Sequence, residues 1–226
     1  MPENEKPEKL IPFSEYDYFG YLSCGSILVV VIDFLRGGKL LEQDKISVPE
    51  GLFLVVAAYI LGQIIAGPAH WLLERKLIAN VLHRPNINLF SKRKLSIQSV
   101  FFHGYYEPFP GSIQHRIKAK AKVEGSENVG ETLFLQVFSR VKQEEATMTR
   151  LNSFRNLYGF CRNVSFTCLL SSLTIAVWVQ IFGGRSKLEW AAAALVISIG
   201  MFYRYLKFYQ QYSYEMFISY LNLPDA

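Results

Sequence analysis

Four residues with polar or minimal side chains recur at steps of three and four within an otherwise apolar stretch. Gln63, Gly67, His70 and Glu74 would therefore lie along one face of a helix. Polar groups in hydrocarbon are costly unless they are hydrogen-bonded or hydrated. This polar strip predicts either hydrogen bonds to another helix of the same subunit or one wall of a water-filled path. In the second case Gln63, His70 and Glu74 are the candidate pore residues.

An acidic residue occupies a similar position in an earlier apolar stretch. Asp33 lies about one turn from the outer end of that stretch, and Arg36 follows it three residues later. The two side chains are neighbours on a helix, so Arg36 can neutralise the carboxylate at the membrane surface. Asp33 is therefore either a paired interfacial residue or a candidate residue at a pore mouth.

Small residues recur every four positions beside the polar strip. Ala58, Gly62 and Ala66 form the pattern that lets two helix backbones approach closely within a lipid bilayer. We therefore predict a close-packed seam along this stripe, and we expect it to contribute to packing between subunits of a homo-oligomer.

The sequence contains none of the catalytic signatures that we sought. It lacks a phosphate-binding glycine loop with Lys and Ser or Thr, a GxSxG turn and an HExxH pair. His70, His83, His103 and His115 have no Cys or carboxylate at metal-ligand spacing around them. We therefore expect a protein that is not an enzyme and that uses no cofactor and no metal.

Four apolar stretches must position these residues. They cover residues 18–35, 51–74, 160–183 and 188–206, and charged segments separate them. A helix needs ~20 apolar residues to cross a hydrocarbon core of roughly 30 Å. A membrane β-barrel would instead show shorter segments that alternate with period two. The sequence therefore predicts an all-α, polytopic membrane protein with four transmembrane helices.

The basic charge is concentrated between the second and third stretches. From Arg75 to Arg155 there are fourteen Lys and Arg against six Glu, a balance of +8, whereas the whole chain carries +5. Because positive loops stay on the cytoplasmic side, residues 75–158 are predicted to form a small cytosolic domain. Both termini are then cytoplasmic, and the protein is placed in a bacterial inner membrane. We expect a disordered N-terminus at 1–17 and a helical cytosolic tail at 207–226.

Helical spacing continues through much of the predicted cytosolic domain. The segment LERKLIANVLHR extends the second stretch and ends before Pro85, while SIQHRIKAKAKV, ETLFLQVFSRVKQ and EEATMTRLNSFRNLYGF read as separate helices. The last of these runs directly into the third stretch. Movements of the cytosolic domain would therefore reach the membrane through continuous helices.

Two clusters of cations in this domain allow three interpretations. Juxtamembrane cations attract anionic headgroups, or they bind a soluble anionic partner. In the third interpretation, aromatic residues of FFHGYYEPF stack on the bases of a nucleic acid or nucleotide, a contact that no motif supports. The cations of this basic patch are Lys92, Arg93, Lys94, Arg116, Lys118, Lys120 and Lys122.

Three phrases carry a resemblance to a known group of proteins. FSEYDYFGYLSCGSILVVVIDF, AAYILGQIIAGPAHWLLERKL and RYLKFYQQYSYEMF resemble small bacterial inner-membrane proteins, some of which accompany anti-phage defence genes. The resemblance transfers no functional residue. It implies an oligomeric membrane effector of antiviral defence that forms a pore or disrupts the membrane under control of its cytosolic domain. The alternative is a non-conducting anchor that positions a soluble cytosolic partner, including a nucleic-acid-binding one, at the lipid bilayer.

Overall fold

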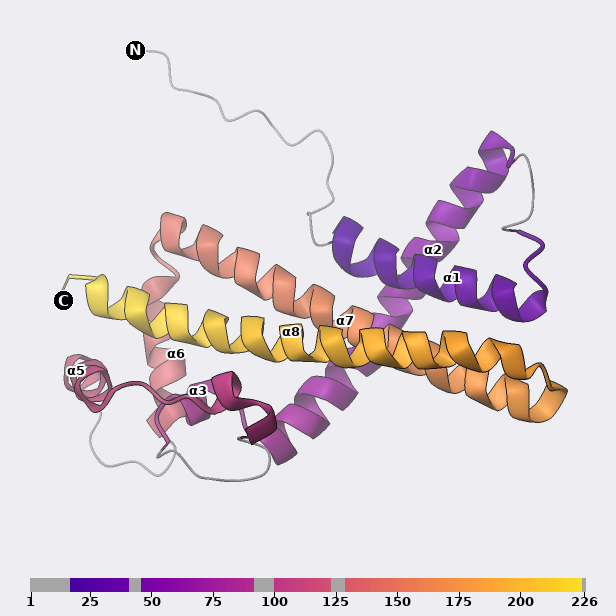
Figure 1. The fold of residues 1–226 in the computed structure, drawn as a ribbon. Helices are drawn as coiled ribbons and strands as arrows, with labels where there is room; N and C mark the ends of the chain where they lie inside the picture. The colour runs from indigo at the N-terminus through magenta and orange to yellow at the C-terminus, as the bar shows by residue number, and fades with distance from the viewer. Residues whose placement is uncertain (1–16, 41–45, 92–99, 123–128, 225–226) are drawn as a thin grey trace, which may run out of the picture.

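The computed structural model describes residues 17–40, 46–91, 100–122 and 129–224, and this part of the chain is all-helical (Figure 1). Long helices dominate it, and short helices pack around one end of the longest pair. The elements are η1 (Asp17–Leu22), α1 (Ser23–Arg36), α2 (Val48–Ala69), η2 (His70–Leu82), α3 (Pro85–Asn88), η3 (His103–Tyr106), α5 (Gly111–Ala121), α6 (Val129–Val141), α7 (Glu145–Phe182), η4 (Arg185–Lys187) and α8 (Leu188–Asn222).

An antiparallel hairpin of α7 and α8 forms the long axis of the molecule (Figure 1). Gly183 and Gly184 make the turn, with φ of 79° and 89° that L side chains rarely adopt. Small hydroxyl residues hold the two helices together. The Ser165 hydroxyl donates to the Ser198 carbonyl at 2.9 Å, and the Ser198 hydroxyl donates to the Ser165 carbonyl at 2.8 Å. These hydroxyls thus satisfy backbone groups, as is usual in membrane helices.

A second long helix crosses this hairpin. The helix α2 begins with a capping box, in which Ser47 accepts from the Glu50 amide and the Glu50 carboxylate accepts from the Ser47 amide. Pro68 lies inside it, and the wider π-helical segment η2 continues it to Leu82. Figure 1 shows α2 and η2 running obliquely past α7 and α8.

The first apolar stretch forms a shorter element that packs on the others. The segments η1 and α1 contact both α2 and α7. Gly37 and Gly38, with φ of 105° and 74°, end α1 in a left-handed turn. The Lys187 ammonium lies 5.1 Å from the centre of the Phe34 ring, so the end of α1 lies beside the α7–α8 turn.

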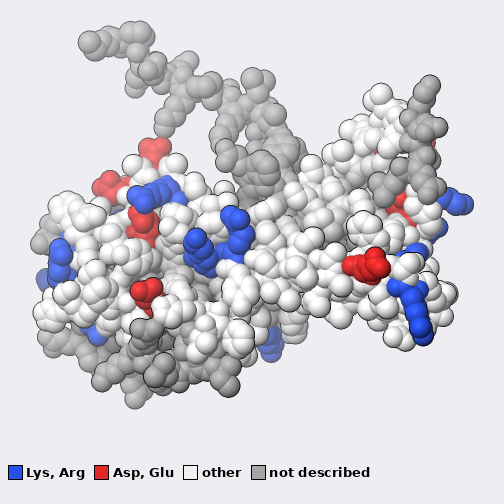
Figure 2. Space-filling model, viewed as in Figure 1, with Lys and Arg blue, Asp and Glu red and all other residues white. Residues whose placement is uncertain are grey.

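Three helices in the described part of the chain are long and apolar enough to cross a membrane. They are Val48–Asn88, Glu145–Phe182 and Arg185–Asn222, so the protein is all-helical and compatible with a membrane protein. The first of the four predicted spans, residues 18–35, corresponds to η1 and α1. These elements do not meet the same criterion of length and composition. Figure 2 shows a band of uncharged surface over the outer half of the hairpin, with charged side chains near its turn and over the half that meets α5 and α6.

The end of the hairpin away from the Gly183–Gly184 turn is surrounded by α3, α5 and α6. The last turns of α8 supply Tyr212, Met216, Phe217 and Tyr220 to a core that these helices close. Ion pairs lie at its edge: Arg150 of α7 binds Glu215 of α8 at 3.0 Å, and Arg84 binds Glu131 of α6. This end is a packed helical unit rather than a loose tail.

The sequence predicted these helices closely. The extension of the second stretch ends at Leu82, before Pro85, and the C-terminal helix continues to Asn222. Both predictions are confirmed. Apolar residues at helical spacing in α6 and in the first half of α7 join the core at this end; they are Phe134, Val137, Phe138, Val141, Met148, Leu151, Phe154 and Tyr158.

Candidate functional site

A polar cluster lies where η2 passes α7. Arg162 of α7 donates from Nη1 to Glu74 Oε2 at 2.6 Å, and the same nitrogen lies 3.2 Å from His70 Nδ1. His70 Nδ1 in turn lies 3.0 Å from Glu74 Oε2. The ring nitrogen can accept from the guanidinium or donate to the carboxylate. Arg162 also donates from Nε to the neighbouring Asn163 Oδ1 at 3.2 Å.

The cluster is largely enclosed by the helices that form it. The Arg162 and Glu74 side chains are 11% and 19% exposed, whereas His70 is 45% exposed. An arginine and a carboxylate this deeply buried must stay paired, because either one alone would leave an uncompensated charge. The cluster therefore binds η2 to α7.

Tyrosine rings fill the space beside this ion pair. Tyr158 of α7 lies 4.9 Å from Tyr209 of α8 between ring centres, and Tyr205 stacks on Tyr209 at 5.9 Å. The Tyr205 hydroxyl is buried and lacks a hydrogen-bond partner within the described residues. Tyr158, Tyr205 and Tyr209 thus form an internal contact between the two long helices.

A further tyrosine fixes the turn after η2. Burial raises the pKa of Tyr105 well above its ordinary value, and the neighbouring Tyr209, Tyr106 and Glu74 act in the same direction. The neutral phenol donates to the His83 carbonyl at 2.7 Å. His83 has a φ of 59°, so this hydrogen bond holds an uncommon backbone conformation.

The structure divides the predicted polar strip. His70 and Glu74 face Arg162, but Gln63 is exposed on the outer side of α2 and donates to the Tyr59 hydroxyl at 3.0 Å. Asp33 lies apart from both. Its Oδ1 accepts from the Leu40 amide at 2.9 Å, within the turn that follows α1. The four candidate pore residues therefore do not share one surface.

The stripe of small residues lies against α1 and η1 of the same subunit. An added Cβ at Gly62 would overlap the Tyr21 carbonyl oxygen, and one at Gly25 would overlap the Ala58 carbonyl oxygen. Ala58 and Gly62 are buried there, and Ala66 is half-buried. The close approach therefore occurs within the subunit, and these two buried residues are not presented to a second copy.

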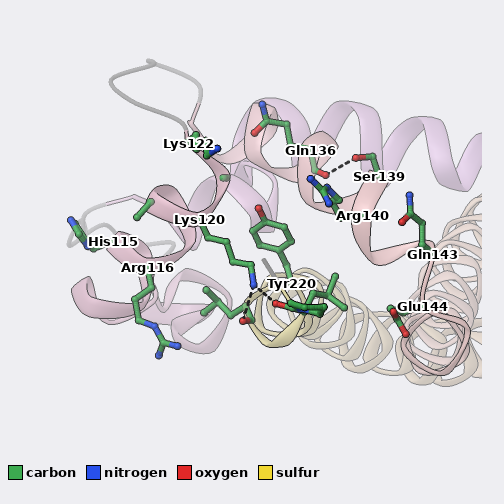
Figure 3. Close-up of a pocket in the computed structure, with 15 residues that line it drawn as sticks. His115, Arg116, Lys120, Lys122, Gln136, Ser139, Arg140, Gln143, Glu144 and Tyr220 are labelled. Atoms are coloured by element: carbon green, nitrogen blue, oxygen red, sulfur yellow. Dashed lines mark hydrogen bonds between the residues drawn. The ribbon is translucent and has the colours of Figure 1, made fainter. Parts of the chain in front are cut away.

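A basic hollow of about 1040 Å³ lies between α5, α6 and the end of α8, at the end of the hairpin away from its Gly183–Gly184 turn (Figure 3). Lys120 lies at its floor and donates to the Leu221 carbonyl at 3.3 Å and to that of Leu223. Arg116, Lys122 and Arg140 line the walls. Within the described residues, no carboxylate forms an ion pair with these three cations.

The predicted basic patch thus contributes in part to one surface. Arg116, Lys120 and Lys122 line the hollow, while Lys118 of the same helix is not among its lining residues. Lys92, Arg93 and Lys94 lie outside the described residues, as does most of the predicted N-terminus at 1–17. Arg140 of α6 was missed, because its place in the hollow depends on how α6 packs on α5.

Within the described residues, neither a reactive thiol nor a metal site adds to the polar cluster or to the basic hollow. Cys24, Cys161 and Cys168 are free and buried, as expected for residues in or beside apolar stretches. In the part of the chain that the structure describes, no three His, Cys, Asp or Glu side chains lie close enough to hold a metal ion.

Comparisons with protein-family models, with curated proteins and with solved structures found no match for this chain. The polar cluster and the basic hollow are therefore the features from which we infer a function.

Proposed function

We propose that the protein is a non-catalytic membrane anchor that positions a soluble acidic partner at a bacterial inner membrane. In this proposal η1–α1, α2 and the outer halves of α7 and α8 form four spans, and the unit around α5 and α6 faces the cytosol. Both termini are then cytoplasmic. The resemblance to proteins found beside anti-phage defence genes suggests such a system as the setting.

The α7–α8 hairpin carries this proposal. Its outer half presents exposed apolar residues such as Val177 and Val196, and its inner half enters the core of the cytosolic unit. From Arg204 to Tyr220 the helix α8 rises by about 24 Å, at 1.5 Å per residue. The hairpin thus holds the basic hollow well clear of the apolar surface.

The polar cluster favours an anchor over a conducting subunit. Glu74 and His70 are engaged by Arg162, whereas Gln63 is exposed and donates to the Tyr59 hydroxyl. A water-filled path needs polar groups that face a shared space. Within one subunit, the described residues offer paired groups instead.

The chemistry of the hollow favours an acidic protein segment as the partner. Arg116, Lys122 and Arg140 present three cations without paired carboxylates, and Glu144 is the acidic residue of the lining. A single-stranded nucleic acid would also need aromatic faces on which bases stack. Tyr105 is buried, and the Tyr220 ring is covered by the Lys120 ammonium at 5.5 Å.

Binding to a defined polyanion tests this function. Full-length protein in nanodiscs of zwitterionic lipid should bind a fluorescent polyglutamate peptide, and added salt should weaken the binding because the contact is electrostatic. Replacing Arg116, Lys122 and Arg140 with Gln should abolish it. The matched variant Arg204→Gln with Lys207→Gln, which removes cations elsewhere on the surface, should bind normally. Equal binding by both variants would refute the proposal, and tighter binding of a single-stranded oligonucleotide would reassign the partner.

One observation favours a second candidate, an oligomeric effector that permeabilises the membrane under the control of the cytosolic unit. Gln63 lies in the middle of an apolar span yet is exposed, and within the described residues its hydrogen-bond partner is Tyr59 of its own helix. Gly67, one turn further on, leaves open space beside it. An amide in lipid gains from a partner on another helix, so a second copy could dock against this face of α2.

A further inference from the structure

A second cavity, of about 690 Å³, lies between the segment around η3 and the middle of α8. One wall is formed by Phe101, Phe102 and His103. The facing wall is the α8 surface that carries Tyr203, Arg204 and Lys207. This groove belongs neither to the polar cluster nor to the basic hollow.

The groove begins where the apolar surface of α8 ends. Exposed large apolar residues continue along α8 from Leu188 to Tyr203, and the next residue is Arg204. Lys207 follows three residues later on the same side of the helix. Tyrosine followed by cations is the arrangement that proteins present at the boundary between hydrocarbon and headgroups. The groove therefore lies at the membrane surface.

The wall opposite α8 also presents exposed apolar residues. Val100 and Phe101 are 72% and 66% exposed, an unusual exposure for neighbouring large apolar residues. Phe102 is anchored beside them, with its ring 5.1 Å from that of Tyr203. This segment is held against α8 while Val100 and Phe101 remain uncovered.

The two cations of the groove have no acidic partner within the described part of the chain. No carboxylate forms an ion pair there with Arg204 or Lys207, and Arg204 hydrogen-bonds the Cys161 thiol. Arg204 is held near the groove by the Phe208 ring, whose centre lies 5.5 Å from the guanidinium carbon. At the cytosolic end, Gln210 donates to the Glu107 carbonyl at 3.3 Å and joins the two walls.

We propose that this groove binds one anionic phospholipid. Arg204 and Lys207, with His103 opposite, receive the phosphate and the negative headgroup. Phe101 and Tyr203 contact the first part of the acyl chains. A zwitterionic lipid presents the same phosphate together with a cationic group. The two basic side chains repel that cationic group, so this lipid binds more weakly.

Native mass spectrometry of the full-length protein in detergent tests the site. Phosphatidylglycerol and phosphatidylcholine are added separately, and the occupancy of the first bound lipid is measured. We expect phosphatidylglycerol to bind about tenfold more tightly than phosphatidylcholine, and Arg204→Gln with Lys207→Gln to remove this difference. Lys207→Gln alone, a change at an exposed side chain, should remove part of it. Arg116→Gln with Arg140→Gln, which removes the same charge from the basic hollow, should leave it intact.

Three results would overturn the assignment. Phosphatidylglycerol could bind the Arg204→Gln, Lys207→Gln variant as tightly as the wild type while both proteins melt at the same temperature. The hollow variant could lose the preference instead. Excess inorganic phosphate could displace phosphatidylglycerol, which would identify a site for a free anion rather than for a lipid. The hollow itself is tested by polyglutamate binding, so failure here leaves the proposed function standing.

Discussion

At the scale of single residues, sequence spacing predicted which side chains share a helix face but not what that face contacts. Gln63, His70 and Glu74 fit one strip, yet only His70 and Glu74 meet Arg162. The wider turns of η2 begin at His70, between Gln63 and Glu74, so the strip of an ideal α-helix does not continue through this segment. Arg162 comes from a helix 88 residues away, so no local pattern could assign it to Glu74.

The first prediction concerns this ion pair. Arg162→Met should leave Glu74 as an uncompensated, mostly buried carboxylate and lower the free energy of unfolding by about 3 kcal/mol. Glu74→Met added to it should recover most of that loss, because both charges are then gone. Chemical unfolding in detergent measures the effect.

Arg185→Met is the control for lost positive charge, since Arg185 is exposed in the turn between α7 and α8. If Arg162→Met and Arg185→Met unfold at the same denaturant concentration, the pair contributes nothing to the fold. If the double variant is no more stable than Arg162→Met, the loss comes from packing around Arg162 rather than from the charge of Glu74.

At the scale of elements, helix existence and helix ends followed from composition and from Gly and Pro. The C-terminal helix was predicted through its tyrosines because the chain from Phe202 to Leu223 contains no Gly or Pro, and α8 indeed ends at Asn222. What the sequence could not supply was the partner of each helix. Ala58 and Gly62 indicated a close approach of two backbones, but the same pattern serves contacts within a subunit and between subunits.

The second prediction uses two glycines of α2. Gly62→Ala should lower the melting temperature in detergent by several degrees, because its Cβ would overlap the Tyr21 carbonyl oxygen and push η1 away. Gly67→Ala makes the same chemical change five residues later, where an added Cβ meets no atom within 4 Å. It should be neutral or slightly stabilising, since Ala favours helix over Gly. Equal melting temperatures of the two variants would contradict the close contact between η1 and α2.

At the scale of the whole molecule, charge asymmetry fixes the expected orientation. The basic segment from Arg75 to Arg155 contains the helical unit formed by α3, α5 and α6, and the hairpin turn at Gly183 and Gly184 lies at the opposite end of α7. Three helices satisfy the criteria for a span, and the first stretch packs beside them. Four spans place both termini on one side, whereas three would separate them. Helix length alone does not decide between four spans and three. The accessibility of introduced cysteines from each side of the membrane does.

The third prediction is this topology. Cysteines introduced at Lys39 and Ser186, both exposed, should react in intact cells with a reagent that cannot cross the inner membrane. A cysteine at Gln143, exposed at the end of α6, should react only after the membrane is permeabilised. The native cysteines are buried and give a low background. Labelling at Gln143 in intact cells would reverse the orientation, and protection at Lys39 would remove η1–α1 from the set of spans.

The last prediction separates an anchor from a pore. Liposomes that contain the wild-type protein should retain an encapsulated dye, since the polar groups of one subunit are paired rather than arranged around a shared space. If copies do assemble through the outer face of α2, the dye should leak, and Gln63→Leu should stop the leak while leaving the melting temperature unchanged.

His70→Leu distinguishes a lining role from a packing role. A path along the whole predicted strip requires that His70→Leu also stop the leak, whereas an interface at Gln63 alone leaves it untouched. Dye retention with wild-type protein, with and without a polyglutamate peptide bound, leaves the anchor as the function. Leakage that neither substitution changes contradicts both models, because the permeable route would then avoid the polar residues of α2 and η2 altogether.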